Sequence, residues 1–395
     1  MSITQRLEEF LCGLTNGAAL IARESPDDRR VCSARAPSTP PDQRNRAAGV
    51  LRGMTGERRL RTSLLFGLVS FALSLLVIFP LLGLAKVNLG RTLHLLASVS
   101  LLWFAALVGL TLVNAFLAAE KWRVANVIAG PGPPSLWVSF SLTAVGVGLG
   151  QVLPVPVATA LARAVGARAL GHGTMLRAGA TTLFEQIFDV IVLGCIALVS
   201  FATLVLGGGP ILWVALVLIV LFSCWLAAGR GTQSLAVAVK GILRRLPPRL
   251  RSARLGAALD ALGCADRRLV RLLLLFSVLR FVTLVALSAV ITAAVGLHIS
   301  LWQLAAALPF AVIAVALAAT PAGLGVNEWA MSAALFAFGT TMHTAVQWVV
   351  LSRILSTVAS AAVGAIGGAI ALCLWRIRAQ RRRGADVQPT GAAGG

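Results

Sequence analysis

The sequence contains no tyrosine and few charged residues. Asp, Glu, Lys and Arg make up 12% of its 395 residues, about half of the share that a soluble domain uses to cover its surface. This scarcity excludes an ordinary soluble protein. Without tyrosine, an aromatic belt at a membrane interface has to come from the nine tryptophans. The chain is instead 58% hydrophobic, in long blocks, which predicts an all-α polytopic membrane protein.

Catalytic and metal-binding motifs are also missing. The six cysteines are scattered without a Cys-x-x-Cys pair, and the four histidines are dispersed. No His-Glu-x-x-His and no Gly-x-Ser-x-Gly occurs. We therefore expect no disulfide framework, no metal site, no cofactor and no catalytic residues, and we do not expect an enzyme.

Acidic residues are fewer than basic ones, 14 against 35, which gives a net charge of +21. In a soluble protein this excess would indicate nucleic acid. Here the Lys and Arg residues lie between apolar blocks, where they set the orientation in the membrane and contact anionic lipid headgroups. We expect membrane lipids as partners and no nucleic acid.

The chain divides into three parts. Residues 1–60 are Arg-rich, contain proline and lack periodicity, which predicts a disordered basic segment. Residues 61–376 form the predicted transmembrane domain, which includes a basic connector at 229–270. Residues 377–395 form a disordered basic tail.

The transmembrane domain contains eight apolar blocks, most of them long enough for one crossing of about 20 residues. They are 64–85, 93–119, 135–153, 181–206, 211–228, 271–296, 302–320 and 343–375. Counting Lys and Arg gives the orientation. The basic segments are those before residue 64, at 163–177, at 229–270 and after 375, and they should be cytoplasmic. The loops without Lys or Arg, 207–210, 297–301 and 339–342, should be external. Lys86 and Arg91 break this pattern. Both termini are predicted to be cytoplasmic, in the cell membrane.

The block at 135–153 cannot cross the membrane alone. It follows the segment 120–134, which carries Lys121 and Arg123, and the chain is cytoplasmic again by 163–177. It must therefore turn back. Pro154 and Pro156 supply the break, because proline lacks the N–H that continues a helix. The segment 157–167 is then predicted to be a half-helix that returns to the cytoplasm.

The block at 302–320 shows the same behaviour from the external side. It breaks at TPAGLG, which contains Pro321, Gly323 and Gly325, and returns through 327–338. The glycines permit the tight turn. About six full transmembrane helices plus two oppositely oriented re-entrant hairpins form an inverted repeat, which is typical of a transporter with its site near the midplane. Both half-helices would direct their N-termini there, and such ends suit a phosphate or a carboxylate.

Charged residues inside the blocks are the candidate substrate-binding residues, because charge at this depth is rare and costly. Glu185 and Asp189 lie on one helix face. In one interpretation they contact a cationic headgroup or carry a coupling proton. In the other they pair with Arg280 or Arg353 as structural ion pairs. The two arginines are in turn either phosphate ligands or counter-charges.

Two further candidates lie on the half-helices. Glu328 is in the first turn of the second one, where a carboxylate caps free N–H groups, and a functional role is the alternative. Arg163 lies late in the first one. It either contacts substrate or extends to the cytoplasmic interface.

Two stretches resemble a known family, the lysylphosphatidylglycerol synthase transmembrane region, also called the flippase-like integral membrane family. They are LPVPVATALARAVGARALGHGTMLRAGATTLFEQIFDVIVLG and TPAGLGVNEWAMSAALFAFG. Members typically show a Pro, a Gly-rich run that ends in Gly-Gly-Asp, an Arg and a span that begins near Glu-Arg, and later Pro-x-Gly-Gly-Leu-Gly-Val-Arg-Glu. The matching residues here are Pro154, Arg163, Glu185, Asp189, Pro321, Gly323, Leu324, Gly325, Val326 and Glu328. The resemblance covers about residues 60–375.

Both motifs depart from the family pattern, the first more than the second. Ala158, Thr159 and Ala160 stand where Gly-Gly-Asp is usual, and Gln186 and Asn327 replace arginines.

The resemblance implies translocation of a lipid, often aminoacylated or linked to a glycosyl or polyprenyl carrier. We expect a lipid flippase that moves a phospholipid or lipid-linked headgroup. The alternatives are a membrane-embedded lipid-modifying transferase and a non-transporting partner of a glycosyltransferase or lipid synthase.

Overall fold

The computed structural model describes residue 83 and the ranges 89–128, 132–227, 267–317 and 323–386, all within the unit Ile78–Gly395. Several predicted features lie outside these residues. They are the disordered segment 1–60, nearly all of the first apolar block at 64–85, most of the connector at 229–270, Pro321, and the last residues of the tail.

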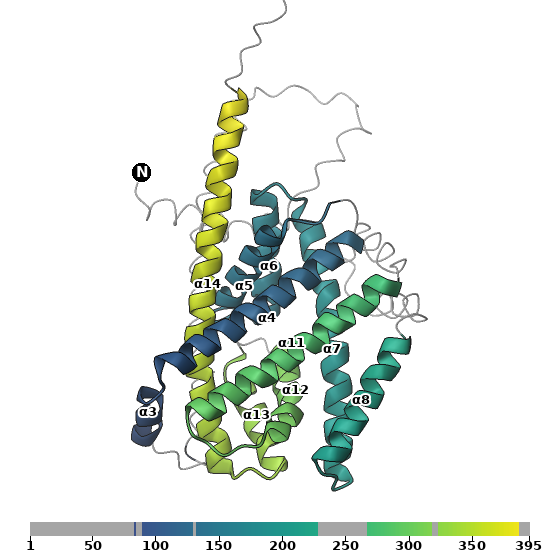
Figure 1. Cartoon of the computed structure of the whole chain (residues 1–395), viewed down its shortest axis with the longest axis vertical. Coiled ribbons are helices and arrows are strands. Elements are labelled where there is room, and N and C mark those ends of the chain that lie inside the picture. The colour runs from purple at the N-terminus through teal and green to yellow at the C-terminus, as the bar shows by residue number, and fades with distance from the viewer. Residues whose placement is uncertain (1–82, 84–88, 129–131, 228–266, 318–322, 387–395) are drawn as a thin grey trace, which may run out of the picture. The chain divides into compact units, whose positions relative to one another are not determined.

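Every regular element in the described ranges is a helix, which confirms the all-α class (Figure 1). In chain order they are α3 (Leu89–Ala97), α4 (Leu101–Ile128), α5 (Leu136–Leu149), α6 (Val155–Ala169), α7 (Met175–Val205), α8 (Pro210–Ala227), α11 (Arg267–Ala294), α12 (Leu301–Leu317), α13 (Val326–Ala337) and α14 (Met342–Asp386).

Five of these helices are long and apolar enough to cross a membrane. The candidate spans are Leu101–Val127, Arg177–Val205, Pro210–Ala227, Arg267–Ala294 and Met342–Gln380. Their outer surfaces are apolar, as lipid requires. On α8, for example, Trp213 and Val217 are the buried residues, while Ile211 and Leu218 are exposed. The chain is therefore a polytopic membrane protein, as predicted.

The block predicted at 93–119 differs from the structure, because it divides into two helices. Helix α3 ends at Ala97 and α4 begins at Leu101. Ser98 Oγ donates to the carbonyl of Leu95 at 2.8 Å, and such a serine competes with the helical hydrogen bonds. Helix α4 then continues to Ile128, beyond the predicted end.

Helices α5 and α6 form the first predicted hairpin. Pro154 occupies the N-cap of α6 and Pro156 lies in its first turn, where a proline lacks no hydrogen bond that the helix needs. Gly146 packs against Thr159, since a Cβ at Gly146 would lie 3.0 Å from the Thr159 Cα. Leu142, one turn earlier, contacts Gly166, further along α6. The contacts run in opposite directions along the two helices, so the pair is antiparallel.

Helices α12 and α13 form the second hairpin. At its base, Gln303 Nε2 donates to the carbonyl of Phe338 at 2.7 Å. Near its tip, the Val315 side chain packs against Gly323. Gly323 and Gly325 have φ of 68° and 84°, a left-handed conformation that favours glycine. These two predicted break residues therefore form the turn into α13.

Helix α14 passes both hairpins and shows how they are oriented. Arg353 forms an ion pair with Glu328, in the first turn of α13. Thr357 Oγ1 donates to Gln151 Oε1 at 3.1 Å, and Gln151 lies in the break between α5 and α6. Arg353 and Thr357 are one helical turn apart, about 6 Å along the axis. The tips of the two hairpins therefore meet at one turn of α14.

The bases of the hairpins lie toward opposite ends of α14. Arg378, near its C-terminal end, donates to the carbonyl of Leu170 at the base of the first hairpin. Phe338, at the base of the second hairpin, precedes the start of α14 at Met342. Figure 1 shows α5 and α6 at the level of the middle of α14, and α12 and α13 at the level of its lower end. The hairpins are therefore oppositely oriented, as predicted.

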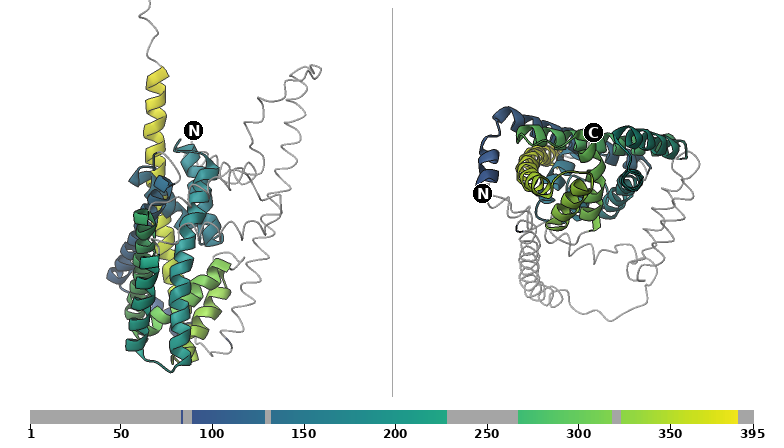
Figure 2. Two further views of the ribbon diagram at one scale, coloured as in Figure 1. Left: turned by 90° about the vertical axis from the view of Figure 1, so that its right-hand side faces the viewer. Right: turned by 90° about the horizontal axis from the view of Figure 1, so that it is seen from below.

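The C-terminal end of α14 extends past the other helices in Figure 1 and in the left view of Figure 2. The helix continues to Asp386, past residue 376, where we expected the disordered tail to begin.

Candidate functional site

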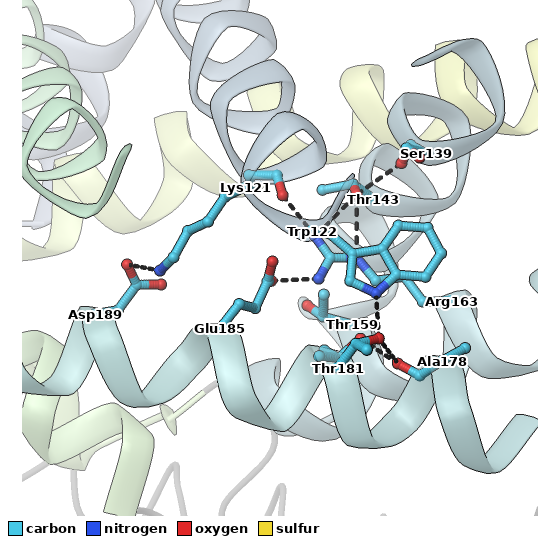
Figure 3. A network of polar contacts seen from close by, with 12 residues as sticks. Lys121, Trp122, Ser139, Thr143, Thr159, Arg163, Ala178, Thr181, Glu185 and Asp189 are labelled. Carbon is cyan, nitrogen blue, oxygen red and sulfur yellow. Dashed lines mark hydrogen bonds and ion pairs between the residues drawn. The ribbon is translucent and has the colours of Figure 1, made fainter. Parts of the chain in front are cut away.

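Arg163 on α6 is a fully enclosed charge, with 0% of the residue exposed. Its Nε and Nη2 donate to Thr143 Oγ1 at 3.1 and 3.0 Å, and Nη2 also donates to the Ala118 carbonyl at 3.0 Å. Its Nη1 pairs with Glu185 on α7, and its guanidinium lies 5.0 Å from the Trp122 ring centroid (Figure 3).

Complete burial excludes the alternative in which Arg163 extends to the cytoplasmic interface. The guanidinium is held by α4, α5 and α7 at once, and its planar shape suits such several-sided binding. A second layer supports it, because Trp122 Nε1 donates to Thr181 Oγ1 at 3.0 Å. Arg163 thus fixes the returning half-helix to three neighbours.

Asp189, one turn beyond Glu185 on α7, forms ion pairs with two more cations. Its Oδ1 lies 2.6 Å from Lys121 Nζ, and its Oδ2 pairs with Arg280 on α11. Arg280 Nε also donates to Asn114 Oδ1 at 3.2 Å. The Lys121 side chain is 0% exposed, whereas those of Asp189 and Arg280 are 20% and 25% exposed. Asp189 and Arg280 are therefore the accessible end of the network.

The placement of Lys121 corrects the sequence analysis, which assigned it to a cytoplasmic segment. It lies inside α4 and points toward Asp189 (Figure 3). The sequence contained a signal, because no Gly or Pro interrupts residues 110–129 and Lys121 follows Asn114 by seven positions on one helix face. Arg123 stays partly exposed and pairs with Glu120.

These five charged residues form two ion-paired groups, Arg163–Glu185 and Lys121–Asp189–Arg280, one helical turn apart on α7, and together we call them the charge network. Its members are Lys121, Arg163, Glu185, Asp189 and Arg280. Three cations face two carboxylates, so within the described residues the network carries one positive charge in excess. Buried charge is costly unless it is compensated. A site of this charge is suited to an anion such as a phosphate group.

A second polar cluster lies where the hairpin tips meet. Glu328 caps α13, because its Oε2 accepts from the Gly325 N–H at 2.6 Å, which confirms the predicted capping role. Its Oε1 lies 3.6 Å from Arg353 Nε and accepts no hydrogen bond from any described residue. Ser332, one turn along α13, is buried, and its Oγ also has no hydrogen-bond partner among them.

The six predicted substrate-binding residues thus fall into two groups. Arg163, Glu185, Asp189 and Arg280 belong to the charge network, and Glu328 and Arg353 to the cluster at the tips. Glu185 pairs with Arg163, and neither Arg280 nor Arg353 is its ion-pair partner. Lys121 was missed. Their roles toward a substrate remain predictions.

Metal binding has no visible basis in the described ranges, where no three His, Cys, Asp or Glu side chains gather. The cationic excess of the charge network would also repel a metal ion.

Comparison with known families identifies the chain. A family model described as "Lysylphosphatidylglycerol synthase TM region" matches residues 67–364, well over half of the sequence. The matched range includes both hairpins and the whole charge network. No curated protein and no solved structure matches the chain. The protein belongs to the family of the lysylphosphatidylglycerol synthase transmembrane region.

Proposed function

We propose that the protein moves a phospholipid or a lipid-linked headgroup across the cytoplasmic membrane. The main observation in support is the meeting of the two hairpin tips at one turn of α14. Helices α6 and α13 both begin at these tips. A helix N-terminus carries N–H donors without intrahelical partners and a partial positive charge; at α13, Glu328 already accepts from one of them, the Gly325 N–H. Two such ends within the bilayer suit an anionic headgroup.

The charge network supports an anionic or zwitterionic substrate. Its excess positive charge attracts a phosphate, and Arg280 is its partly exposed arginine. A headgroup needs such a polar path because hydrocarbon cannot solvate it. The acyl chains need no path of their own, since the outer surface of the helices is apolar.

In this proposal the tips separate on one side and then on the other, so that the polar interior opens to each leaflet in turn. Contacts between described residues at the tips would have to break. They include the hydrogen bond between Gln151 and Thr357 and the ion pair between Glu328 and Arg353.

Lipid movement in reconstituted vesicles tests the function. Vesicles carry fluorescent phosphatidylglycerol, and a membrane-impermeant reductant bleaches the outer leaflet. We expect the protein to make the inner-leaflet label accessible. Arg280→Gln should slow this by about tenfold or more, while Arg123→Gln, a surface arginine paired with Glu120, should leave it unchanged. No acceleration by the unaltered protein would refute the proposal.

The same proposal makes the protein a transporter and not an enzyme. A lipid synthase or glycosyltransferase would then supply or use the moved lipid. Headgroup turnover by the purified protein in detergent would instead favour the transferase alternative.

We also propose that both termini lie on the cytoplasmic side. Arg168 and Arg177 lie at the base of the first hairpin, where Arg378 joins it to the end of α14. The loops toward the other end, 206–209, 295–300 and 339–341, contain no Lys or Arg. This asymmetry matches the excess of Lys and Arg in cytoplasmic loops.

Cysteine labelling on intact cells tests the orientation. In a variant without native cysteines, Gly209→Cys should react with an impermeant maleimide. His172→Cys should react only after the membrane is opened. The opposite pattern would reverse the proposed orientation.

A further inference from the structure

Two fully buried carboxylates, Glu185 and Glu328, and the partly exposed Asp189 lie in the described membrane helices, and their surroundings differ. Both oxygens of Asp189 take part in ion pairs. One oxygen of Glu185 pairs with the enclosed Arg163 guanidinium, and the other accepts no hydrogen bond. Glu328 is 2% exposed. Its Oε1 has Arg353 Nε at 3.6 Å and no hydrogen bond from any described residue. Glu328 is thus the carboxylate with the loosest ion pair.

A proton on Glu328 Oε1 needs an acceptor, and the nearest candidate along the helix is Ser332, which is not hydrogen-bonded to Glu328 in the structure. Ser332 lies four positions further along α13, on the same helix face. Its side chain is 0% exposed, and its Oγ has no hydrogen-bond partner in the described ranges. A protonated carboxyl group can donate to this hydroxyl oxygen. A side-chain rotation that brings the two groups together on protonation would satisfy two buried polar atoms that have no hydrogen bond in the described ranges.

Few other charges act on Glu328. Arg353 on α14 is the charged side chain that lies against it. Helix α12 contains no titratable residue, and α13 contains none besides Glu328. The protonation state of Glu328 and the pairing of Arg353 therefore depend on each other directly.

We propose that Glu328 binds the proton that couples lipid movement to a proton gradient; this inference rests on the proposed function. The proton adds to Oε1, the ion pair with Arg353 breaks, and Oε2 keeps the N–H of Gly325. Arg353 Nε can then turn toward a lipid phosphate, and loss of the proton restores the pair.

Thermodynamic linkage between proton binding and lipid binding fixes the direction in which the two move relative to each other. If protonation of Glu328 favours phosphate at Arg353, then bound phosphate favours protonation by the same factor. Proton and anionic lipid therefore bind together and cross in the same direction. Release of the proton on the alkaline side re-forms the ion pair and expels the headgroup.

A pH gradient across reconstituted vesicles tests this coupling. With fluorescent phosphatidylglycerol as probe, we expect label to move toward the alkaline side several-fold faster than without a gradient. A sodium gradient of the same size should have no effect. Glu328→Gln, which mimics the neutral side chain, should lose the response to pH. Glu120→Gln, a partly exposed carboxylate on α4, should keep it.

Ser332→Ala provides a second variant with a smaller change. It removes the acceptor for the protonated carboxyl group, so the pH midpoint of the gradient effect should move to lower pH. A third measurement does not depend on transport. Infrared spectra of the detergent-solubilised protein should show a protonated carboxyl band that grows when short-chain phosphatidylglycerol is added. The band should be absent from Glu328→Gln.

The outcomes separate the two proposals. Lipid movement that ignores the pH gradient would overturn the coupling and leave the transport function intact. A response to pH that persists in Glu328→Gln, or an infrared band unaffected by this substitution, would also overturn it. If the unaltered protein moves no lipid at all, both proposals fail.

Discussion

Arg163 and Glu185 form an ion pair whose side chains are 0% and 2% exposed. The pair joins the half-helix α6 to the long helix α7. Removing one partner of such a pair leaves an uncompensated charge in a medium of low dielectric constant. It therefore acts first as a structural connection that holds the returning half-helix in place, whatever part it plays in binding a headgroup.

Arg163→Met should lower the free energy of unfolding by about 3–5 kcal/mol, because Glu185 loses its hydrogen-bonded cation. The double variant Arg163→Met with Glu185→Leu should recover most of that loss, since no charge is then stranded. Reversible unfolding in mixed detergent micelles measures both. Equal losses in the single and double variants would show that the pair is not what stabilises this contact.

The close approach of α5 and α14 yields a second prediction. A Cβ at Gly364 would lie 2.7 Å from the Cα of Gly148, a backbone atom that cannot turn aside. Gly364→Ala should therefore destabilise the protein by about 1–3 kcal/mol through overpacking. Thermal unfolding of the purified protein provides the measurement.

Gly368 is the matched control, one helical turn further along α14. A Cβ there meets nothing within 4 Å, so Gly368→Ala should be neutral or stabilise the helix by up to about 1 kcal/mol. Similar destabilisation by both substitutions would contradict the proposed packing of α5 against α14.

His172, in the loop between α6 and α7, provides a pH-dependent prediction. Burial, and next the charge of Arg378, lower the pKa of its imidazole from the ordinary value of 6.5. The unfolded chain then binds the proton more readily, so stability is lost as pH falls below 6.5 toward the folded-state pKa. His172→Asn should reduce this loss in unfolding midpoints measured at successive pH values. An unchanged pH dependence would show that His172 is not responsible.

The hairpins could be predicted because neighbouring residues mark each break and because the side of the membrane follows from counting the charges in each loop. Pro154 and Pro156 interrupt an apolar block, Gly323 and Gly325 permit a left-handed turn, and loop charges fix the sides. The structure shows breaks in these places and adds the point where the tips meet. That point depends on contacts with Arg353 and Thr357, more than 190 residues from the first tip, which no local pattern reveals.

The charge network was predicted only in part, for a physical reason. Counting charges treats any Lys near the end of an apolar block as a loop residue, yet helix propensity carries α4 past Lys121 to Ile128. Pairing depends on how α4, α6 and α7 pack, so Arg163 was not recognised as the partner of Glu185. The division between α3 and α4 was missed because two serines rather than a Gly or Pro interrupt the block.

The most direct test of the proposed transport is to tie the hairpin tip to α14. Gln151 and Thr357 are hydrogen-bonded at 3.1 Å, so cysteines at both positions, with the native cysteines replaced, can be joined by a short thiol-reactive cross-linker that a reductant cleaves. We expect the cross-link to stop movement of fluorescent phosphatidylglycerol in vesicles and the reductant to restore it, while each single cysteine variant is unaffected by the reagent. Lipid that crosses at the full rate with the cross-link in place would contradict transport through the meeting point of the two hairpins.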